Sequence, residues 1–282
     1  MLTAIMIGDS YGAGFEFKSS MLQYNDGQKY HNHPTHMSSD GSGNSLRAGQ
    51  YTDDTQMSMA VAETILTKDY SKENFTKHFV EAFKRDPRKG YASRFYAFLM
   101  SVSDGKDFLY KIRPNSDKNG SAMRACPIGF LPKITEVMKV CKTQAKITHD
   151  TAGGIAGAQA VSAACFFLMD GVKKKDIRNE IDRLLPGFGF NKDYTEKVPC
   201  NAVKTARAAL TAYSRCDTYK KLLIEAVSYG GDTDSTASIA MGIASCDPTY
   251  SKIFPKKLER DIENKNYGFE YAKTLDMKLE AL

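Results

Sequence analysis

Helical periodicity is the feature that most constrains how this chain can fold. Between residues 202 and 213, apolar residues recur at three- and four-residue steps, the spacing that gathers side chains on one face of an α-helix. No segment combines period-two alternation with β-branched residues and a hairpin turn, so the sequence predicts an all-α fold. The other helices that the periodicity predicts lie at about residues 57–66, 71–85, 91–103, 133–142, 152–169, 173–184, 217–229, 234–245 and 256–264.

Length and composition predict one folded domain. The chain has 282 residues, of which 42% are hydrophobic, and this is enough to build a sizeable core. There is no fixed-period repeat and no linker between compositionally different halves, so we expect a single domain over residues 1–282. The formal charge of +6 would favour polyanionic substrates in general. It falls short of the concentrated basic face of a dedicated nucleic-acid binder.

Cysteine spacing and the absence of targeting signals predict a cytoplasmic protein. The six cysteines include no C-x-x-C pair and no histidine at zinc-finger spacing, so we interpret them as reduced thiols. The first seven residues are too short for a signal peptide and lack a basic start. Residues 151–169 carry no charge and are long enough to span a membrane. Their small and polar members favour a buried central helix, and we expect a monomer with no membrane partner.

Polar stretches rich in Gly, Asn, Ser and Pro predict three long loops, at residues 21–51, 104–121 and 186–200. Long loops in a compact domain are candidates for the walls of a functional site. The first contains His31, His33 and His36 in H-x-H-x-x-H spacing. This cluster could bind a transition metal, but it has no cysteine and no apolar frame, so we favour an ordinary polar loop.

Two acidic clusters stand where predicted helices begin. The first is Thr52-Asp53-Asp54-Thr55, and the second is Asp232-Thr233-Asp234-Ser235. Asp and Thr at a helix start have an ordinary explanation, because they cap free backbone N–H groups and complement the helix dipole. A cap needs only one oxygen, whereas each cluster offers two carboxylates and flanking hydroxyls. The clusters therefore also qualify as ligand sets.

As ligand sets, the clusters would form a site for divalent cations. Residues i and i+2 of a regular helix do not face each other, so Asp232 and Asp234 can converge only if the chain turns. Gly230 and Gly231 supply the backbone freedom for such a turn. The candidate ligands are all oxygens, which suit Mg²⁺ or Mn²⁺ and argue against Zn²⁺. Four Asp side chains drawn together would repel one another without cations between them.

Five motifs occur in an order that resembles the ADP-ribosylglycohydrolase superfamily. They extend from residue 8 to about residue 243 and cover nearly the whole chain. The T-D-D-T and G-G-D-T-D segments are the most distinctive. The five motifs are Gly8-Asp9-Ser10-Tyr11-Gly12 with Glu16, Tyr51-Thr52-Asp53-Asp54-Thr55-Gln56-Met57, Asn119-Gly120-Ser121-Ala122-Met123-Arg124 with Pro127 and Gly129, Thr148-His149, and Gly230-Gly231-Asp232-Thr233-Asp234-Ser235.

The resemblance implies a compact orthogonal multi-helix bundle around two Mg²⁺ or Mn²⁺ ions. Glu16 would lie on a mobile flap over the site and, with Asp53 and Asp234, would be catalytic, while Gly8 and Asp9 would buttress the site. The metal ligands implied by the motif match are Thr52, Asp53, Asp54, Asp232, Asp234 and Ser235. The residues implied for ADP-ribose binding are Ser116, Lys118, Asn119, Gly120, Ser121 and His149.

Two positions depart from the pattern of the family. Ser235 stands where relatives usually have Thr, and a hydroxyl ligand survives that change. The loop Asn115-Ser116-Asp117-Lys118 stands where many relatives are Gly-rich. The resemblance implies that backbone N–H groups of this loop face a diphosphate, where Asp117 is unfavourable and Lys118 favourable.

The resemblance implies hydrolysis of the glycosidic bond between ADP-ribose and a modified target, which could be a protein, a nucleic acid or a small molecule. Two cations would bind the vicinal hydroxyls of the distal ribose, and water would attack the anomeric carbon through an oxocarbenium-like state. Two alternatives stay open. One is a non-catalytic ADP-ribose-binding or structural protein that keeps the fold. The other is a two-metal phosphoesterase, for which the sequence offers no group set to stabilise an in-line phosphorane.

Overall fold

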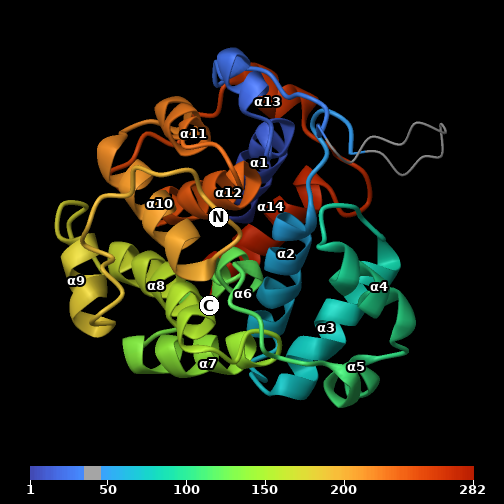
Figure 1. Ribbon diagram of the computed structural model, residues 1–282. Coiled ribbons are helices and arrows are strands. Elements are labelled where there is room, and N and C mark those ends of the chain that lie inside the picture. Colours follow the sequence, from blue (N-terminus) through green and yellow to red (C-terminus); the bar gives the residue numbers. More distant parts are fainter. Residues whose placement is uncertain (35–45) are drawn as a thin grey trace.

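Helices make up nearly all of the regular structure in the computed structural model, which describes residues 1–34 and 46–282 (Figure 1). Within these residues, pairing between extended segments is limited to three isolated bridges. The predicted all-α fold is therefore confirmed. In chain order the α-helices (α) and 3-10 helices (η) are α1 (Leu2–Gly12), η1 (Ala13–Phe15), η2 (Ser19–Tyr24), α2 (Asp53–Leu66), α3 (Lys72–Arg85), α4 (Ser93–Ser101), α5 (Gly105–Lys111), α6 (Gly120–Met123), η3 (Cys126–Phe130), α7 (Ile134–Lys146), α8 (Ala152–Met169), α9 (Ile177–Leu184), α10 (Ala202–Arg215), α11 (Tyr219–Ser228), α12 (Thr233–Cys246), α13 (Lys256–Asp261) and α14 (Phe269–Glu280).

Helices α1 and α12 pack side by side at the centre of the molecule (Figure 1). Two glycines of α1 allow this close approach. A Cβ atom on Gly8 would stand 2.5 Å from the carbonyl oxygen of Ala237, and one on Gly12 would stand 2.3 Å from that of Thr233. The Thr233 hydroxyl donates to the Gly12 carbonyl oxygen at 2.8 Å. This contact sets the start of α12 against the end of α1, where the chain continues to Glu16.

Helix α8 is the uncharged segment whose length raised the question of a membrane span. Residues Ala152–Met169 are long and apolar enough to cross a membrane by length and composition, yet 67% of this stretch is buried within the fold. The helix packs against α7, α10 and α6. Its position agrees with the prediction of a central core helix.

The structure adds four α-helices that periodicity did not predict: α1, α5, α6 and α14. Helix α1 buries ten of its eleven residues, so it shows no alternation between a polar and an apolar face. Helix α5 interrupts the stretch 104–121, where the prediction of a continuous loop was wrong. It begins at Asp104, whose side chain accepts hydrogen bonds from the backbone N–H groups of Lys106 and Asp107. Of the predicted loop 21–51, residues 35–45 lie outside the described part of the chain.

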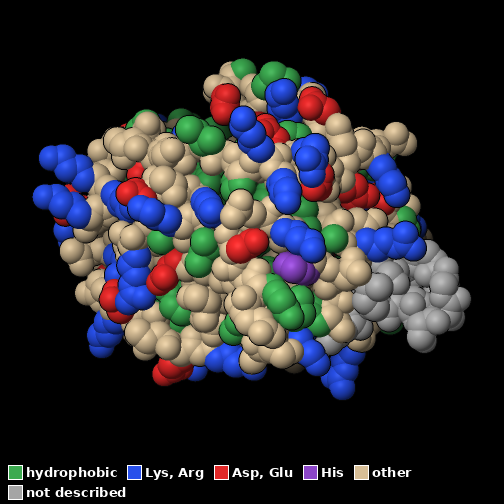
Figure 2. Space-filling view, turned by 90° about the horizontal axis from the view of Figure 1, so that it is seen from above, with side chains coloured by type: hydrophobic (Ala, Val, Ile, Leu, Met, Phe, Trp, Pro, Cys, Tyr) green, Lys and Arg blue, Asp and Glu red, His purple; other side chains and the backbone are tan. Residues whose placement is uncertain are grey.

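The main hydrophobic core gathers side chains from Met1 to Leu279 into one cluster. All six cysteines are free thiols, as their spacing predicted, and five of them are buried. On the face seen in Figure 2, blue Lys and Arg side chains are scattered among red carboxylates and uncharged surface. This distribution agrees with the modest positive charge and shows no continuous basic face on that side.

Candidate active site

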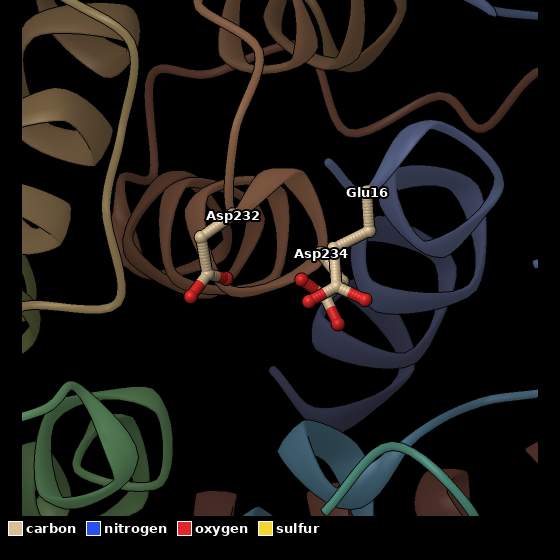
Figure 3. A group of neighbouring side chains, drawn as sticks. All are labelled: Glu16, Asp232 and Asp234. Carbon is tan, nitrogen blue, oxygen red and sulfur yellow. The ribbon is translucent and has the colours of Figure 1, made fainter. Parts of the chain in front are cut away.

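Carboxylates from separate parts of the chain meet at one end of the α1–α12 pair. Asp232 and Asp234 come from the start of α12, and Glu16 follows η1. Each offers a carboxylate oxygen within 4.8 Å of the other two. Figure 3 shows the Glu16 and Asp234 carboxylates together, with Asp232 facing the same space from the other side. Asp53 and Asp54 stand in the first turn of α2 and are close enough for the charge of Asp232 to raise the pKa of both. The two predicted acidic clusters therefore converge.

The turn before Asp232 depends on two glycines in the left-handed backbone region. Gly230 has a φ of 67° and Gly231 a φ of 82°, values that glycine adopts without steric cost. A Cβ atom on Gly231 would also stand 2.0 Å from the carbonyl oxygen of Val198. The predicted turn is confirmed. Although Asp232 occupies the N-cap position of α12, its side chain makes no capping hydrogen bond, so the helix-cap explanation does not describe this residue.

The cluster at the start of α2 combines a cap with buried carboxylates. The Thr52 side chain accepts a hydrogen bond from the Asp54 backbone N–H at 3.3 Å, so the cap explanation holds for Thr52. The Asp54 carboxylate accepts hydrogen bonds from the hydroxyls of Ser238 at 2.8 Å and Ser235 at 3.3 Å. These contacts join the first turn of α2 directly to α12.

Asp9 supports the α2 cluster from α1. Its Oδ2 atom accepts hydrogen bonds from the backbone N–H groups of Thr52 at 2.9 Å and Thr55 at 3.1 Å, and from the Thr55 hydroxyl at 2.5 Å. Its Oδ1 atom has no hydrogen-bond partner among the described residues. Burial raises the pKa of the Asp9 carboxyl. Asp9 thus satisfies N–H groups that the first turn of a helix leaves free, which agrees with the predicted buttressing role.

Glu16 is held both by the adjacent backbone and by its side chain. The next residue, Phe17, has a φ of 49°, which bulky residues rarely adopt. Its N–H donates to the Gly231 carbonyl oxygen at 2.8 Å and so fixes this turn beside Asp232. Glu16 Oε2 and His33 Nε2 share a hydrogen bond of 2.5 Å. Burial, followed by the charge of Asp232, raises the pKa of Glu16 to about 8, and burial lowers the pKa of His33 to about 4.

The histidines of the H-x-H-x-x-H stretch do not share one site in the structure. His33 is bonded to Glu16. The His31 ring packs edge-on against Phe15, with ring centroids 5.3 Å apart. His36 lies outside the described residues.

The donor set fits divalent cations. Burial raises the pKa of Asp53, Asp54 and Asp234, and the charges of neighbouring carboxylates raise them further. Within residues 1–34 and 46–282, none of these three forms an ion pair with Lys, Arg or His. Buried carboxylates without counter-ions must be either protonated or neutralised by bound cations. Since the carboxylates and hydroxyls of the two clusters offer only oxygen ligands, these residues match Mg²⁺ or Mn²⁺.

Two residues of the predicted ADP-ribose loop have structural partners. Asn119 Nδ2 donates to Asp232 Oδ2 at 2.9 Å, so this buried side chain orients a candidate metal ligand. The Ser121 hydroxyl is fully buried and donates to the Gly154 carbonyl oxygen at 2.8 Å, which ties α6 to α8. Any contact of Ser121 with a ligand would therefore involve its backbone.

The loop of residues 115–118, which precedes Asn119, is held by a backbone hydrogen bond. Asp117 accepts a hydrogen bond from the Ala202 backbone N–H at 3.1 Å through its carbonyl oxygen. Lys118 is exposed, Ser116 is half-buried, and the Ser116 hydroxyl accepts from the Lys118 backbone N–H at 3.2 Å. The loop thus lies against the start of α10, and the Lys118 side chain is open to solvent.

His149 lies next to this loop at the end of a chain of hydrogen bonds. Arg124 Nη2 donates to Thr148 Oγ1 at 2.8 Å, and Thr148 Oγ1 lies 2.6 Å from His149 Nδ1. Thr148 Oγ1 therefore links the buried Arg124 guanidinium to the His149 ring. Burial lowers the pKa of His149 to about 3. A Cβ atom on Gly120 would stand 3.0 Å from the ring, so a neutral imidazole lies beside the predicted ADP-ribose loop.

Replacing Thr148 with valine should destabilise the protein. The change keeps the volume of the side chain but removes a hydrogen-bond acceptor of Arg124. The Arg124 side chain is only 1% exposed, so a water molecule cannot replace this acceptor. We expect the free energy of unfolding to fall by about 2 kcal/mol, as for a buried donor left unsatisfied, measured by urea denaturation. Thr143→Val is the matched control, because the Thr143 hydroxyl is exposed and bonds only within its own helix. Equal stability of the two variants would contradict this role.

Three side chains at the site were not among the predicted site residues. Ser238 stands three residues after Ser235, and this spacing alone would have placed both on one helix face. His33 was considered as a transition-metal ligand, and the sequence favoured an ordinary polar loop instead. Cys200 is half-buried beside Asp232, and burial and that carboxylate raise the pKa of its thiol. No sequence pattern indicated Cys200, because its neighbour is 32 positions away (Cys200 to Asp232).

Comparison with known proteins agrees with the fold and the motifs. A family model described as ADP-ribosylglycohydrolase matches residues 1–260. The chain is 27% identical over 252 residues to ADP-ribosyl-[dinitrogen reductase] glycohydrolase of Rhodospirillum rubrum, covering 84% of this chain and 80% of that protein. It is 22% identical over 252 residues to ADP-ribosylhydrolase ARH3 of Homo sapiens, covering 69% of each.

A solved structure shares the fold. It belongs to an ADP-ribosylglycohydrolase-related protein complex and superposes with a TM-score of 0.72 at 20% identity, covering 99% of this chain and 95% of that one. The orthogonal bundle implied by the motifs is therefore confirmed. Since the family model spans most of the sequence and the motif carboxylates converge in the fold, the chain belongs to the ADP-ribosylglycohydrolase family.

Proposed function

We propose that this protein hydrolyses the glycosidic bond between ADP-ribose and a modified target and releases ADP-ribose. The observation that carries the proposal is the convergence of Glu16, Asp232 and Asp234 in a chain of this family. Like-charged carboxylates are costly to bury, and a protein that only binds ADP-ribose or only keeps the fold has no need to gather them. Family membership also favours glycosidic over phosphoester hydrolysis.

The proposed cofactor is a pair of Mg²⁺ or Mn²⁺ ions. The residues that would hold them are Thr52, Asp53, Asp54, Asp232, Asp234 and Ser235. When bound, the ions would supply positive charge that binds and orients the hydroxyls of the distal ribose. Asn119 and Asp9 support this role, because each holds part of the ligand set in place through hydrogen bonds.

Residues of the chain would handle the proton and bind the ADP-ribose. In the reaction, a water oxygen bonds to the anomeric carbon and gives up one proton, the bond to the target breaks with its electron pair, and the departing atom gains one proton. Glu16 would hold or transfer a proton in this step, and its pKa of about 8 supports a protonated carboxyl at neutral pH. His149, held through its Nδ1 atom by Thr148, would offer its Nε2 atom for a hydrogen bond with the ADP-ribose.

We propose a modified protein as the target. The Rhodospirillum rubrum relative is named for a protein target, dinitrogen reductase. The free thiols are in keeping with a cytoplasmic location, which we also propose. The test is a panel of arginine-, serine- and nucleic-acid-linked ADP-ribose, with free ADP-ribose measured by chromatography. Release from a protein-linked substrate is expected. Binding of the panel without release from any member would favour the non-catalytic alternative.

Removal of divalent cations should abolish the release of ADP-ribose, and Mg²⁺ or Mn²⁺ should restore it, because all the proposed ligands are oxygens. Dialysis against a chelator followed by addition of single metals tests this. The melting temperature should rise when Mg²⁺ or Mn²⁺ is added to the metal-free protein, because the ions bind the folded state. Full activity after exhaustive chelation, or recovery with Zn²⁺ alone, would overturn the two-metal proposal.

A further inference from the structure

We propose that His33 is a positioning residue that holds the Glu16 carboxyl in its working orientation. This inference rests on the function proposed above. Glu16 Oε2 and His33 Nε2 lie 2.5 Å apart, and the exposed fractions of the two side chains are 16% and 1%. These two largely buried side chains are therefore hydrogen-bonded to each other inside the site. The sequence analysis favoured an ordinary polar loop over a transition-metal site here, and the geometry points to a different role.

Glu16 needs such a partner because nothing else in the described part of the chain holds its side chain by a hydrogen bond. Burial, followed by the charges of Asp232 and Asp9, raises the pKa of Glu16, and Asp234 lies in the same group. The groups that surround the Glu16 carboxyl are thus mainly other carboxylates. A flexible glutamate side chain with a single hydrogen bond would adopt several rotamers if that bond were lost. His33 supplies that restraint.

His33 can position Glu16 because its own segment is tied to the scaffold. The His33 backbone N–H donates to the Leu46 carbonyl oxygen at 3.1 Å. One residue earlier, Asn32 Oδ1 accepts a backbone N–H at 2.9 Å. The Tyr30 hydroxyl donates to a backbone carbonyl oxygen of α13 at 3.0 Å. Residues 30–33 are thus held at three points, so the imidazole ring has a defined place from which to hold the carboxyl.

The first test compares two substitutions of His33. His33→Ala removes the partner, whereas His33→Gln places an amide near the position of Nε2 and can donate or accept. We expect His33→Ala to lower kcat about tenfold or more with little change in KM, the scale of a misplaced catalytic group. His33→Gln should restore most of the lost kcat. His31→Ala is the matched control, because His31 lies on the same segment but packs on Phe15 and Tyr24.

A double-mutant cycle shows whether His33 acts through Glu16. In a Glu16→Gln background, His33→Ala should cause no further loss of kcat, because the group that it positions has already been disabled. If His33→Ala lowers kcat by the same factor in both backgrounds, His33 acts independently and the proposal is wrong.

A third readout does not depend on turnover. The chain has only five histidines, so the ring ¹⁵N resonances can be assigned in the metal-free protein by single substitutions. Glu16→Gln should shift the Nε2 resonance of His33 and leave that of His31 in place. If the wild type is active, an unchanged kcat in His33→Ala together with an unshifted His33 resonance in Glu16→Gln would overturn the role of His33 and leave the proposed function standing. A wild type that hydrolyses no linkage would overturn the proposed function and the role of His33 with it.

Discussion

Asp234→Ala is expected to abolish the release of ADP-ribose and to weaken the binding of Mg²⁺ or Mn²⁺. Asp234 shares the carboxylate group with Glu16 and Asp232, and the charge of Asp54 also reaches it. Removing it takes one negative charge from the site that we propose binds two dications, and the affinity of such a site depends on the number of charged ligands.

The same substitution should not unfold the protein. Burial and the charges of Glu16 and Asp232 raise the pKa of Asp234. A carboxyl whose pKa is raised by folding stabilises the fold below its unfolded pKa, and that contribution is lost as the pH rises through the folded value. At neutral pH, the metal-free wild type therefore bears the cost of this crowded group. The metal-free Asp234→Ala protein should be at least as stable as the metal-free wild type.

Calorimetric metal titration, thermal melts with and without Mg²⁺, and an assay for released ADP-ribose test this prediction. Asp104→Ala is the control, because Asp104 caps α5 through two backbone N–H groups and lies at the surface. That variant should lose about 1 kcal/mol of stability, as helix caps do, and keep its turnover. If Asp234→Ala behaved like Asp104→Ala, with normal metal affinity and turnover, the acidic cluster would be a cap and our central claim would be wrong.

Glu16→Gln is expected to lower kcat by about two orders of magnitude or more, the scale of lost acid–base catalysis. The substitution keeps the shape of the side chain and a hydrogen bond to His33 but removes the group that exchanges a proton. The six proposed ligands are untouched, so Mg²⁺ or Mn²⁺ should still bind. The fold should also be kept, because the turn after Glu16 is held by the backbone bond from Phe17 to Gly231.

Single-turnover kinetics, a metal titration and a thermal melt separate these effects. Glu63→Gln provides a contrasting control. Glu63 is buried and pairs with Arg85 at 2.5 Å and with the Tyr271 hydroxyl at 2.6 Å, so its loss should lower stability and leave kcat unchanged. An unchanged rate in Glu16→Gln would reduce Glu16 to an ordinary carboxylate at the edge of the site.

Helix prediction from the sequence succeeded where a helix has one buried face. Helices α10 and α3 were predicted because their apolar residues repeat along one side, with polar residues opposite. Helix α1 was missed because other parts of the fold cover it on all sides, so its apolar and polar residues show no helical periodicity. Helix α5 was missed because Gly, Pro, Asn and Ser near it suggested a continuous loop, and the capping role of Asp104 was not considered.

The sequence by itself determined the elements of the site that are local. A pair of glycines before Asp232 predicted the turn, and the acidic residues at two helix starts predicted oxygen ligands, because backbone freedom and ligand chemistry depend on the residue types alone. The order of the motifs identified the family, which the family model bears out. It also implied the fold, to which the solved structure is similar.

Only the tertiary structure decided which of these groups meet. The packing of α1 on α12 through Gly8 and Gly12 brings Glu16 to the Asp232 cluster. The bonds from Ser238 to Asp54 and between His33 and Glu16 join residues with no local relation in the chain. Such contacts depend on the directions of side chains after distant helices have packed. No periodic pattern in a single sequence reports that geometry. For this reason the candidate ligands could be predicted from the sequence, whereas the partner that holds Glu16 could not.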